Sequence, residues 1–495
     1  MVTTDKTFCM LNYRLIYKIL GSLQFMLGML LLVCTGIAFF YHEDDILAFL
    51  VSAIFTFCSG FVLKYWGRDA DNNLSRRDSY LLVTVTWVIF SFFGMLPFII
   101  SGYITNLTDA FFETISGFTT TGATILDDVE CLPHAMLFWR TQTQWIGGLG
   151  IVFFTIAILP SIAGNGTVKV FAAEATGPLR AKMHPRLSTM AKWIWSIYLS
   201  LTVACVVSFY FAGMDWFDSI NYAMTTTATG GFATHNDSAA FFQSPAIEYI
   251  AIVFQFLAGI NFMMLYACIF RLRPGTLLKS SEFKMYITII IGASLWIGYL
   301  LMTRNGYGLE RAFRSSLFQV VSFMTTTGLF NDDAALWPHI TWVILGCLMF
   351  VGACSGSTTG GFKCIRLVMV IKVLRNEFHK LLHPNAIFPV KINGIPVPRS
   401  QLSTLLAFFA IFTLMVLLTA TLMIASDIDN TNAITIALSC ISNVGPTLGT
   451  QIGPEMSWSG LPVHVKWLCS FLMLVGRLEI MSVLVLFTRS FWKDN

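Results

Sequence analysis

Phe118-Thr119-Thr120-Thr121-Gly122-Ala123-Thr124 is the stretch from which we predict the fold, because related runs occur three more times in the chain. Each run is polar, contains a glycine and follows an apolar segment too short to cross a bilayer. The glycines at 122, 230, 328 and 445 are 108, 98 and 117 residues apart, which indicates a long internal repeat. We therefore expect all four polar runs to converge on one axis. Polar runs 2, 3 and 4 are Thr225-Thr226-Thr227-Ala228-Thr229-Gly230-Gly231-Phe232, Met324-Thr325-Thr326-Thr327-Gly328-Leu329-Phe330 and Ser442-Asn443-Val444-Gly445-Pro446-Thr447.

The composition is that of a membrane protein with many spans. Of the 495 residues, 56% are hydrophobic and only 12% are charged, against about 25% charged residues in soluble domains. Runs of about 20 apolar residues predict membrane-spanning helices. The ten predicted spans lie near 19–40, 46–63, 80–104, 134–160, 191–213, 246–270, 285–303, 336–372, 401–425 and 463–487.

Basic residues gather in four connectors, which the positive-inside rule places in the cytoplasm together with both termini. The segments between these connectors carry the polar runs and hold mostly acidic charges, so the runs are predicted on the outer side. Only the third departs, with Arg304, Arg311 and Arg314 near its outer loop. The four connectors lie around 64–77, 169–192, 271–284 and 363–399.

A short predicted helix precedes each polar run. Ten residues of helix, such as 107–116, rise only about 15 Å, which is half of a hydrocarbon core of about 30 Å. Such a segment must turn back on the side it entered, and irregular backbone at that depth has to be buried in protein or line a wet path. We predict an all-α polytopic membrane protein with four span–pore helix–span repeats around a pseudo-fourfold pore. The units are an accessory hairpin at 1–78 and repeats at 79–190, 191–283, 284–398, which includes an intramembrane loop, and 399–495.

The chemistry of the polar runs favours a monovalent cation. Helix C-terminal ends carry partial negative charge, and exposed backbone carbonyls can replace the hydration shell of an ion. The runs contain no carboxylate, which argues against a divalent site. A single run would be more simply explained as a threonine-rich turn, but four in register favour a potassium filter. The predicted ion-binding residues are Thr120, Thr121, Gly122, Thr227, Ala228, Thr229, Gly230, Thr326, Thr327, Gly328, Asn443, Val444 and Gly445.

Two features predict a gate below the filter. The third return segment is interrupted by glycines, for which we favour a break in the helix over small-residue helix packing. Arg477 lies within the last predicted span, where an arginine costs about 2.5 to 3.5 kcal/mol and needs a wet cavity or a partner. Partnership with Glu479 or with a helix-end carbonyl is the alternative to a gating role. The predicted gating residues are Gly352, Gly356, Ser357, Thr358, Gly360, Gly361, Lys363 and Arg477.

Together these motifs resemble the Trk/Ktr/HKT superfamily of potassium transporters, closest to the bacterial Trk system membrane (pore-forming) subunit. The resemblance implies a homodimer in the bacterial cytoplasmic (inner) membrane, a separate cytoplasmic nucleotide-binding regulatory subunit, and a pore obstructed by the loop after Gly352 and by Arg477. The motifs are Thr119-Thr120-Thr121-Gly122-Ala123-Thr124, Ala228-Thr229-Gly230-Gly231-Phe232, Phe256-Leu257-Ala258-Gly259-Ile260-Asn261-Phe262, Thr325-Thr326-Thr327-Gly328, Gly356-Ser357-Thr358-Thr359-Gly360-Gly361, Ser442-Asn443-Val444-Gly445-Pro446 and Gly476-Arg477-Leu478-Glu479.

We therefore expect gated potassium uptake. A sodium- or proton-coupled secondary transporter of potassium, or a weakly selective monovalent cation channel, would contain the same polar runs and gate residues. No enzymatic activity is expected, because no evident His, Asp or Glu constellation lies in the spans. No covalent cofactor and no nucleic-acid partner are expected, and the absence of a dinucleotide fingerprint leaves nucleotide binding to the regulatory partner. Because the four runs differ after their glycines, selectivity should be unevenly distributed among them.

Overall fold

The structure, a computed structural model, describes residues 11–71, 74–150, 187–272, 274–386, 388–449 and 456–493. Almost all regular structure in these residues is helical, and the short strands β1 (Lys391–Ile392) and β2 (Ile395–Pro396) pair in one antiparallel hairpin. Six helices are long and apolar enough to cross a membrane, or up to eight if each of two bent pairs is one span. The predicted helical, membrane-spanning class is confirmed.

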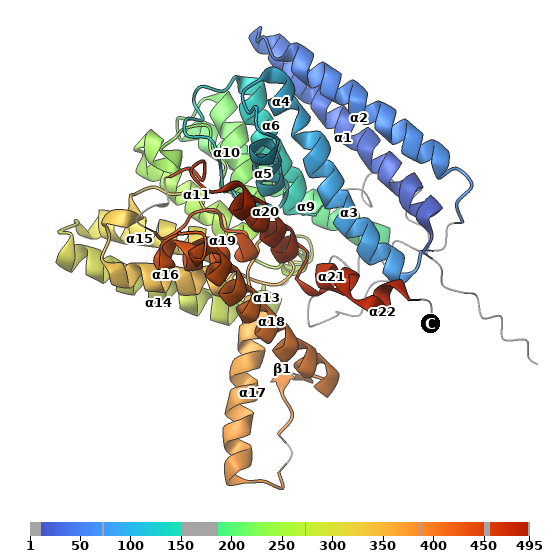
Figure 1. The fold of residues 1–495 in the computed structure, drawn as a ribbon. Helices are drawn as coiled ribbons and strands as arrows, with labels where there is room; N and C mark the ends of the chain where they lie inside the picture. Colours follow the sequence, from blue (N-terminus) through green and yellow to red (C-terminus); the bar gives the residue numbers. More distant parts are fainter. Residues whose placement is uncertain are drawn as a thin grey trace, which may run out of the picture.

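The first two helices, α1 (Tyr13–Tyr41) and α2 (Ile46–Trp66), form a hairpin that contains none of the polar runs. The two helices pack along each other, and α1 also contacts α3 (Arg76–Gly94) and α6 (His134–Gly148). Figure 1 shows the hairpin on one side of the molecule, beside α3. The hairpin is therefore peripheral to the rest of the helices.

A short helix ends at each polar run, as the sequence predicts. An acceptor side chain caps three of them at the N-terminus, where free N–H groups need partners. Asn106 accepts from the N–H of Thr108, Asp215 from that of Asp218, and Asp429 from that of Thr431. The four helices are α5 (Leu107–Phe118), α10 (Trp216–Ala228), α15 (Leu309–Met324) and α19 (Asn430–Ser442).

Further helices surround the short ones. Each short helix contacts the long helix before it and the helix that follows it, and also the return helix of another set. These last contacts pair α6 with α10, α11 with α15, α16 with α19, and α20 with α5, so they close into a ring. The surrounding helices are α4 (Leu96–Ser101), α9 (Leu187–Phe211), α11 (Pro245–Ala258), α14 (Ser281–Arg304), α16 (His339–Val351), α18 (Arg399–Ile424) and α20 (Val463–Arg477).

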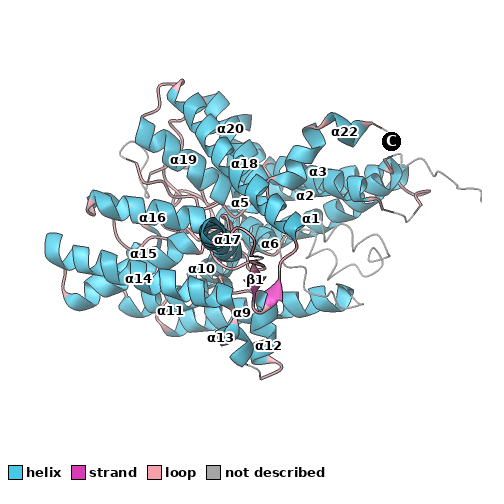
Figure 2. Cartoon of the chain, turned by 90° about the horizontal axis from the view of Figure 1, so that it is seen from below, coloured by secondary structure: helices cyan, strands magenta, loops and turns pink. Residues whose placement is uncertain are grey.

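The remaining helical elements are short or lie at one end of the bundle. Helix α17 projects from the bundle in Figure 1 and is seen nearly end-on in Figure 2. These elements are η1 (Ser238–Phe242), α12 (Phe262–Ile269), α13 (Gly275–Lys279), η2 (Ala334–Leu336), α17 (Cys364–Leu382), α21 (Met481–Leu484), η3 (Val485–Phe487) and α22 (Arg489–Trp492).

Three return segments are broken, although we predicted a break only in the third. That break is confirmed, since α16 ends at Val351 and α17 begins at Cys364. The continuous spans predicted at 246–270 and 463–487 are wrong: α11 and α12 meet at 104°, and α20 and the α21–η3 segment at 109°. Asn261 restarts the helix at the first bend, because its side chain accepts from the N–H groups of Met263 and Met264. The end of the predicted span 134–160, and most of the connector at 169–192, lie outside the described residues.

Two of the three basic residues near the third predicted outer loop form ion pairs. Arg311 lies 3.6 Å from Asp332, while Arg314 pairs with Glu310 at 2.8 Å and also with Glu248. These two positive charges are therefore balanced locally, and they do not count against the predicted outer placement of the third run.

Candidate ion-binding site

The four polar runs meet in a ring. Each contains a glycine packed so closely against the next run that a Cβ atom there would overlap a backbone carbonyl oxygen. Run 1 meets run 2, run 2 meets run 3, run 3 meets run 4, and run 4 meets run 1. The overlapping pairs are Gly122 with the Gly230 oxygen, Gly231 with Thr327, Gly328 with Val444, and Gly445 with Thr121.

The same backbone turn ends each short helix. One residue adopts the left-handed conformation, and the next donates its N–H to a carbonyl five residues earlier, at 2.8 to 3.0 Å. A glycine with positive φ follows, between 79° and 95°, which side chains other than hydrogen rarely tolerate. The left-handed residues are Thr120, Thr229, Thr326 and Asn443, and the glycines are Gly122, Gly231, Gly328 and Gly445.

This geometry corrects the predicted register of run 2. We aligned Gly230 with the glycines of the other runs, but Gly231 has the positive φ, at 86°, and packs against run 3. Gly230 instead occupies the place of Thr121, Thr327 and Val444, as its N–H bond to the Thr225 carbonyl shows. Gly231 is thus a residue of the ring that the predicted site omits.

Backbone oxygens are the groups that this ring offers to a ligand. Thr121, Thr327 and Val444 are fully buried, and within the described part of the chain no hydrogen bond ends on their carbonyls. Buried carbonyls are seldom left unpaired, so these three are candidate ligands for a cation. The equivalent carbonyl in run 2, that of Gly230, differs because it accepts a hydrogen bond from Gln144 Nε2 at 2.7 Å.

Threonine hydroxyls hold the backbone of the runs. Thr119 and Thr325 each bond to a helix carbonyl four residues earlier, at 2.7 Å. Their hydroxyls also lie 2.8 and 2.7 Å from those of Thr121 and Thr327. Asn443 donates to the Thr121 hydroxyl at 3.0 Å and so joins run 4 to run 1. The side chains therefore fix the turns, while the carbonyls remain available.

The interrupted segment between α16 and α17 lies against three of the runs, and we call residues 352–363 the intramembrane loop. The Thr358 hydroxyl donates to the carbonyl of Thr227 at 3.3 Å, and the Gly360 N–H donates to the Thr326 hydroxyl at 2.8 Å. A Cβ at Gly360 would overlap the Ser442 carbonyl. The loop is thus packed directly onto runs 2, 3 and 4.

Arg477 joins this loop to the end of α6. Its guanidinium donates to the carbonyl of Thr358 at 2.7 Å, to that of Gly148 at 2.7 Å, and to that of Gly147. The carbonyls of Gly147 and Gly148 are the helix-end partners that the sequence offers as the alternative to a gating role. Arg477 contacts both these carbonyls and the loop. Lys363 bonds within the loop, to the carbonyl of Thr359. Both predicted gating cations therefore contact the loop backbone.

Two residues that the predicted gate omits hold the other side of the loop. Glu282, in the first turn of α14, accepts from the Ser355 N–H at 2.5 Å. Asn261 donates to the Ser355 carbonyl at 2.5 Å. The signal available for Glu282 is a carboxylate at the start of an apolar helix, and Asn261 belongs to one of the motifs that carry the family resemblance.

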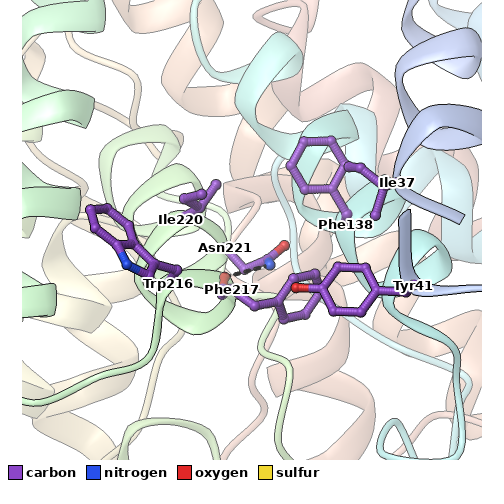
Figure 3. A pocket seen from close by; sticks show the side chains of 7 residues that line it. All are labelled: Ile37, Tyr41, Phe138, Trp216, Phe217, Ile220 and Asn221. Carbon is purple, nitrogen blue, oxygen red and sulfur yellow. Dashed lines mark hydrogen bonds between the residues drawn. The ribbon is translucent and has the colours of Figure 1, made fainter. Parts of the chain in front are cut away.

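A small pocket lies elsewhere, between α1, α6 and α10 (Figure 3). Tyr41, Phe138, Trp216 and Phe217 supply aromatic walls. None of its lining residues belongs to a polar run or to the intramembrane loop, so we do not include it in the candidate site.

His235, in the loop after run 2, gives a testable pH dependence. Its ring lies 3.0 Å from Asp218 and 3.4 Å from Glu130. Burial lowers the pKa of His235, but the hydrogen bond and charge of Asp218, with the charge of Glu130, raise it overall. A raised pKa stabilises the fold fully below the unfolded value of about 6.5, and this stability is lost as pH rises through the folded pKa.

We therefore expect the thermal midpoint of the detergent-solubilised protein to fall between about pH 6 and about pH 9, and the fall to be smaller in His235→Gln. Thermal unfolding followed by tryptophan fluorescence measures it. His339→Gln is the control, since its ring packs on Trp342 and makes no ion pair in the described residues. If the thermal midpoint fell equally with pH in His235→Gln and in the unsubstituted protein, His235 would not be the source of the pH dependence.

The helices define a polytopic membrane protein, and buried unpaired carbonyls at converging helix ends are groups that receive a cation. A family model described as TrkH, cation transport protein, matches residues 46–494. The chain belongs to this family of cation transport proteins.

Individual relatives support this family membership. The Trk system potassium uptake protein TrkH of Escherichia coli K12 is 37% identical over 491 residues, which cover 98% of this chain and 100% of that protein. TrkG of the same strain, also a Trk system potassium uptake protein, is 32% identical and covers 98% of this chain and 99% of its own length. The crystal structure of the potassium transporter TrkH from Vibrio parahaemolyticus superposes with a TM-score of 0.88 at 33% identity, covering 97% of this chain and 100% of that one.

Proposed function

We propose that this chain takes up potassium across the bacterial cytoplasmic membrane through a filter formed by its four polar runs. The observation that carries the proposal is the closed ring of glycines and carbonyls, in which the oxygens of Thr121, Thr327 and Val444 are buried and accept no hydrogen bond from the described residues. Such oxygens can replace the water around a monovalent cation. The relatives, which are potassium uptake proteins by name, support potassium as the ion.

In this proposal residues 79–190, 191–283, 284–398 and 399–495 are four repeats around one pseudo-fourfold pore, and 1–78 is accessory. The ring of contacts that runs from α6 and α10 to α20 and α5 supports this arrangement. Both termini lie in the cytoplasm, and the chain acts as a homodimer with a nucleotide-binding regulatory subunit, as expected from the family resemblance.

The intramembrane loop and Arg477 form the gate of the proposed pore. The loop contacts the runs through Thr358 and Gly360, and Arg477 contacts the loop through the Thr358 carbonyl. Movement of either element would therefore change what lies directly beneath the runs. A weakly selective cation channel is the second candidate, favoured by the inequality of the ring, in which the Gly230 carbonyl is already bonded to Gln144.

Isotope uptake by reconstituted vesicles tests the ion. We expect rubidium uptake to be suppressed by potassium at concentrations roughly tenfold below those of sodium that give the same suppression, because a carbonyl site discriminates by ion size and ligand number. Gly328→Ala is expected to abolish uptake, because φ is +79° and a Cβ would overlap run 4. Equal suppression by potassium and sodium would support the weakly selective channel, and full uptake by Gly328→Ala would exclude the filter.

A further inference from the structure

Behind runs 1 and 2 lies an ion pair that the proposed filter does not use. Arg140 of α6 and Glu113 of α5 are 2.9 Å apart, and their side chains are only 2% and 1% exposed. Of the ion pairs in the described ranges, no other has both partners so deeply buried. Isolated buried charges are costly, so a pair at this depth must be held by further hydrogen bonds.

These further bonds go to the polar runs and to the residues that directly follow them. Glu113 accepts from the Thr124 hydroxyl at 3.0 Å and from the Ile125 N–H at 3.0 Å. Arg140 donates to the carbonyl of Ala233 at 3.1 Å and packs over the Phe232 ring at 4.2 Å. Thr124 and Ala233 each follow the positive-φ glycine of their own run by two residues. The pair therefore joins runs 1 and 2 at the same level.

Gln144, one turn further along α6, holds a second part of run 2, between Thr225 and Phe232. It donates to the Gly230 carbonyl at 2.7 Å, and its oxygen accepts from the Phe232 N–H at 3.1 Å and from the Thr225 hydroxyl at 2.7 Å. Glu113, Arg140 and Gln144 thus make a buttress from two helices behind two adjacent runs. At the junction of runs 2 and 3 the Ala239 N–H donates to the Phe330 carbonyl at 3.1 Å, and the ion pair there, Arg314 with Glu248, is less deeply buried, at 12% and 7% exposed.

We propose that this buttress of Glu113, Arg140 and Gln144 sets the discrimination between potassium and sodium by fixing the spacing of runs 1 and 2. The inference rests on the proposed filter. Charge-assisted hydrogen bonds are stronger than neutral ones, and the Arg140–Glu113 pair is more deeply buried than the Arg314–Glu248 pair. The wall formed by runs 1 and 2 therefore has the least freedom to contract around a smaller ion. None of the three is assigned contact with the ion, and their role is positioning.

The test compares selectivity with total flux in the full chain, reconstituted in vesicles. Glu113→Gln keeps the shape and removes the charge, and Gln144→Met keeps the length and removes both hydrogen-bonding groups. Each is expected to lower the preference for potassium over sodium, measured by competition with rubidium, by roughly tenfold, at the low end of what outer-shell substitutions cost at metal sites.

Asp109→Asn is the matched control. Asp109 lies on the same helix as Glu113 and pairs with Lys466 at 2.6 Å. This pair joins α5 to α20 and makes no bond to a polar run among the described residues. Its preference for potassium should be unchanged. If Glu113→Gln is not recovered as monodisperse protein, Gln144→Met carries the test alone.

Unchanged preference in the recovered variants, with any loss confined to total flux, would overturn the buttress. Gly328→Ala, measured in parallel, separates this failure from that of the filter itself. If Gly328→Ala abolishes uptake while Glu113→Gln and Gln144→Met keep the preference, only the buttress fails. If Gly328→Ala also transports normally, the proposed filter fails with it.

Discussion

Gly231→Ala is expected to lower potassium uptake by at least about 100-fold, the size of effect that a misplacement of about 1 Å can have at a reaction centre. Gly231 has φ +86°, and a Cβ would overlap the backbone carbonyl of Thr327 in run 3. Backbone atoms of a buried run cannot rotate away, so the two runs would have to separate. Initial rates of rubidium uptake, normalised to the amount of protein in the membrane, measure the loss.

Two variants isolate the cause of this loss. Gly102→Ala has a matching φ of +82° but nothing within 4 Å, so it introduces the strain of about 1 to 3 kcal/mol without an overlap. It should transport normally. Gly230→Ala has no positive φ, and the three atoms nearest to its added Cβ all belong to the Gln144 side chain, so it should keep part of the uptake and lose selectivity. Greater loss in Gly230→Ala than in Gly231→Ala would contradict the corrected register.

The error in register shows what the sequence could provide. Short apolar segments followed by threonine and glycine predict the helices α5, α10, α15 and α19, and the structure has all four. Run 2 contains an additional threonine and two consecutive glycines, so either Gly230 or Gly231 can be aligned with Gly122. Only the residue at which α10 ends decides between them, and helix ends cannot be read from sequence to within one residue.

The buttress could be predicted only in part. Arg140 lies within an apolar return segment, as Arg477 does, and an ionisable residue at that depth signals a site. Its partner could not be read from the sequence, because Glu113 is 27 residues away on another helix and is one of several acids on the predicted outer side. The bend at Gly259 was missed for a related reason: apolar residues on both sides of Asn261 give the composition of one continuous span.

The opposite effect, a gain of flux, is expected at the proposed gate. Arg477→Ala should raise basal rubidium uptake by roughly tenfold, because a unit charge about 4 Å from a passing cation costs it about 4 kcal/mol at an intermediate dielectric, part of which the neighbouring carbonyls offset. The guanidinium also ties the Thr358 carbonyl to those of Gly147 and Gly148, and its loss would free the loop from α6. Uptake is measured without the regulatory partner, so that basal flux is observed.

Arg477→Lys separates charge from bonding. Lysine keeps the positive charge but cannot span three carbonyls with a planar fork. If repulsion closes the pore, Arg477→Lys should stay near the basal flux of the unsubstituted chain; if the tie between α6 and the loop closes it, Arg477→Lys should resemble Arg477→Ala. Arg304→Ala, at the end of α14, is the control for removing a positive charge elsewhere. A lower thermal midpoint with unchanged flux in Arg477→Ala would make Arg477 a brace between helix and loop, because a residue that obstructs the pore cannot be removed without changing conduction.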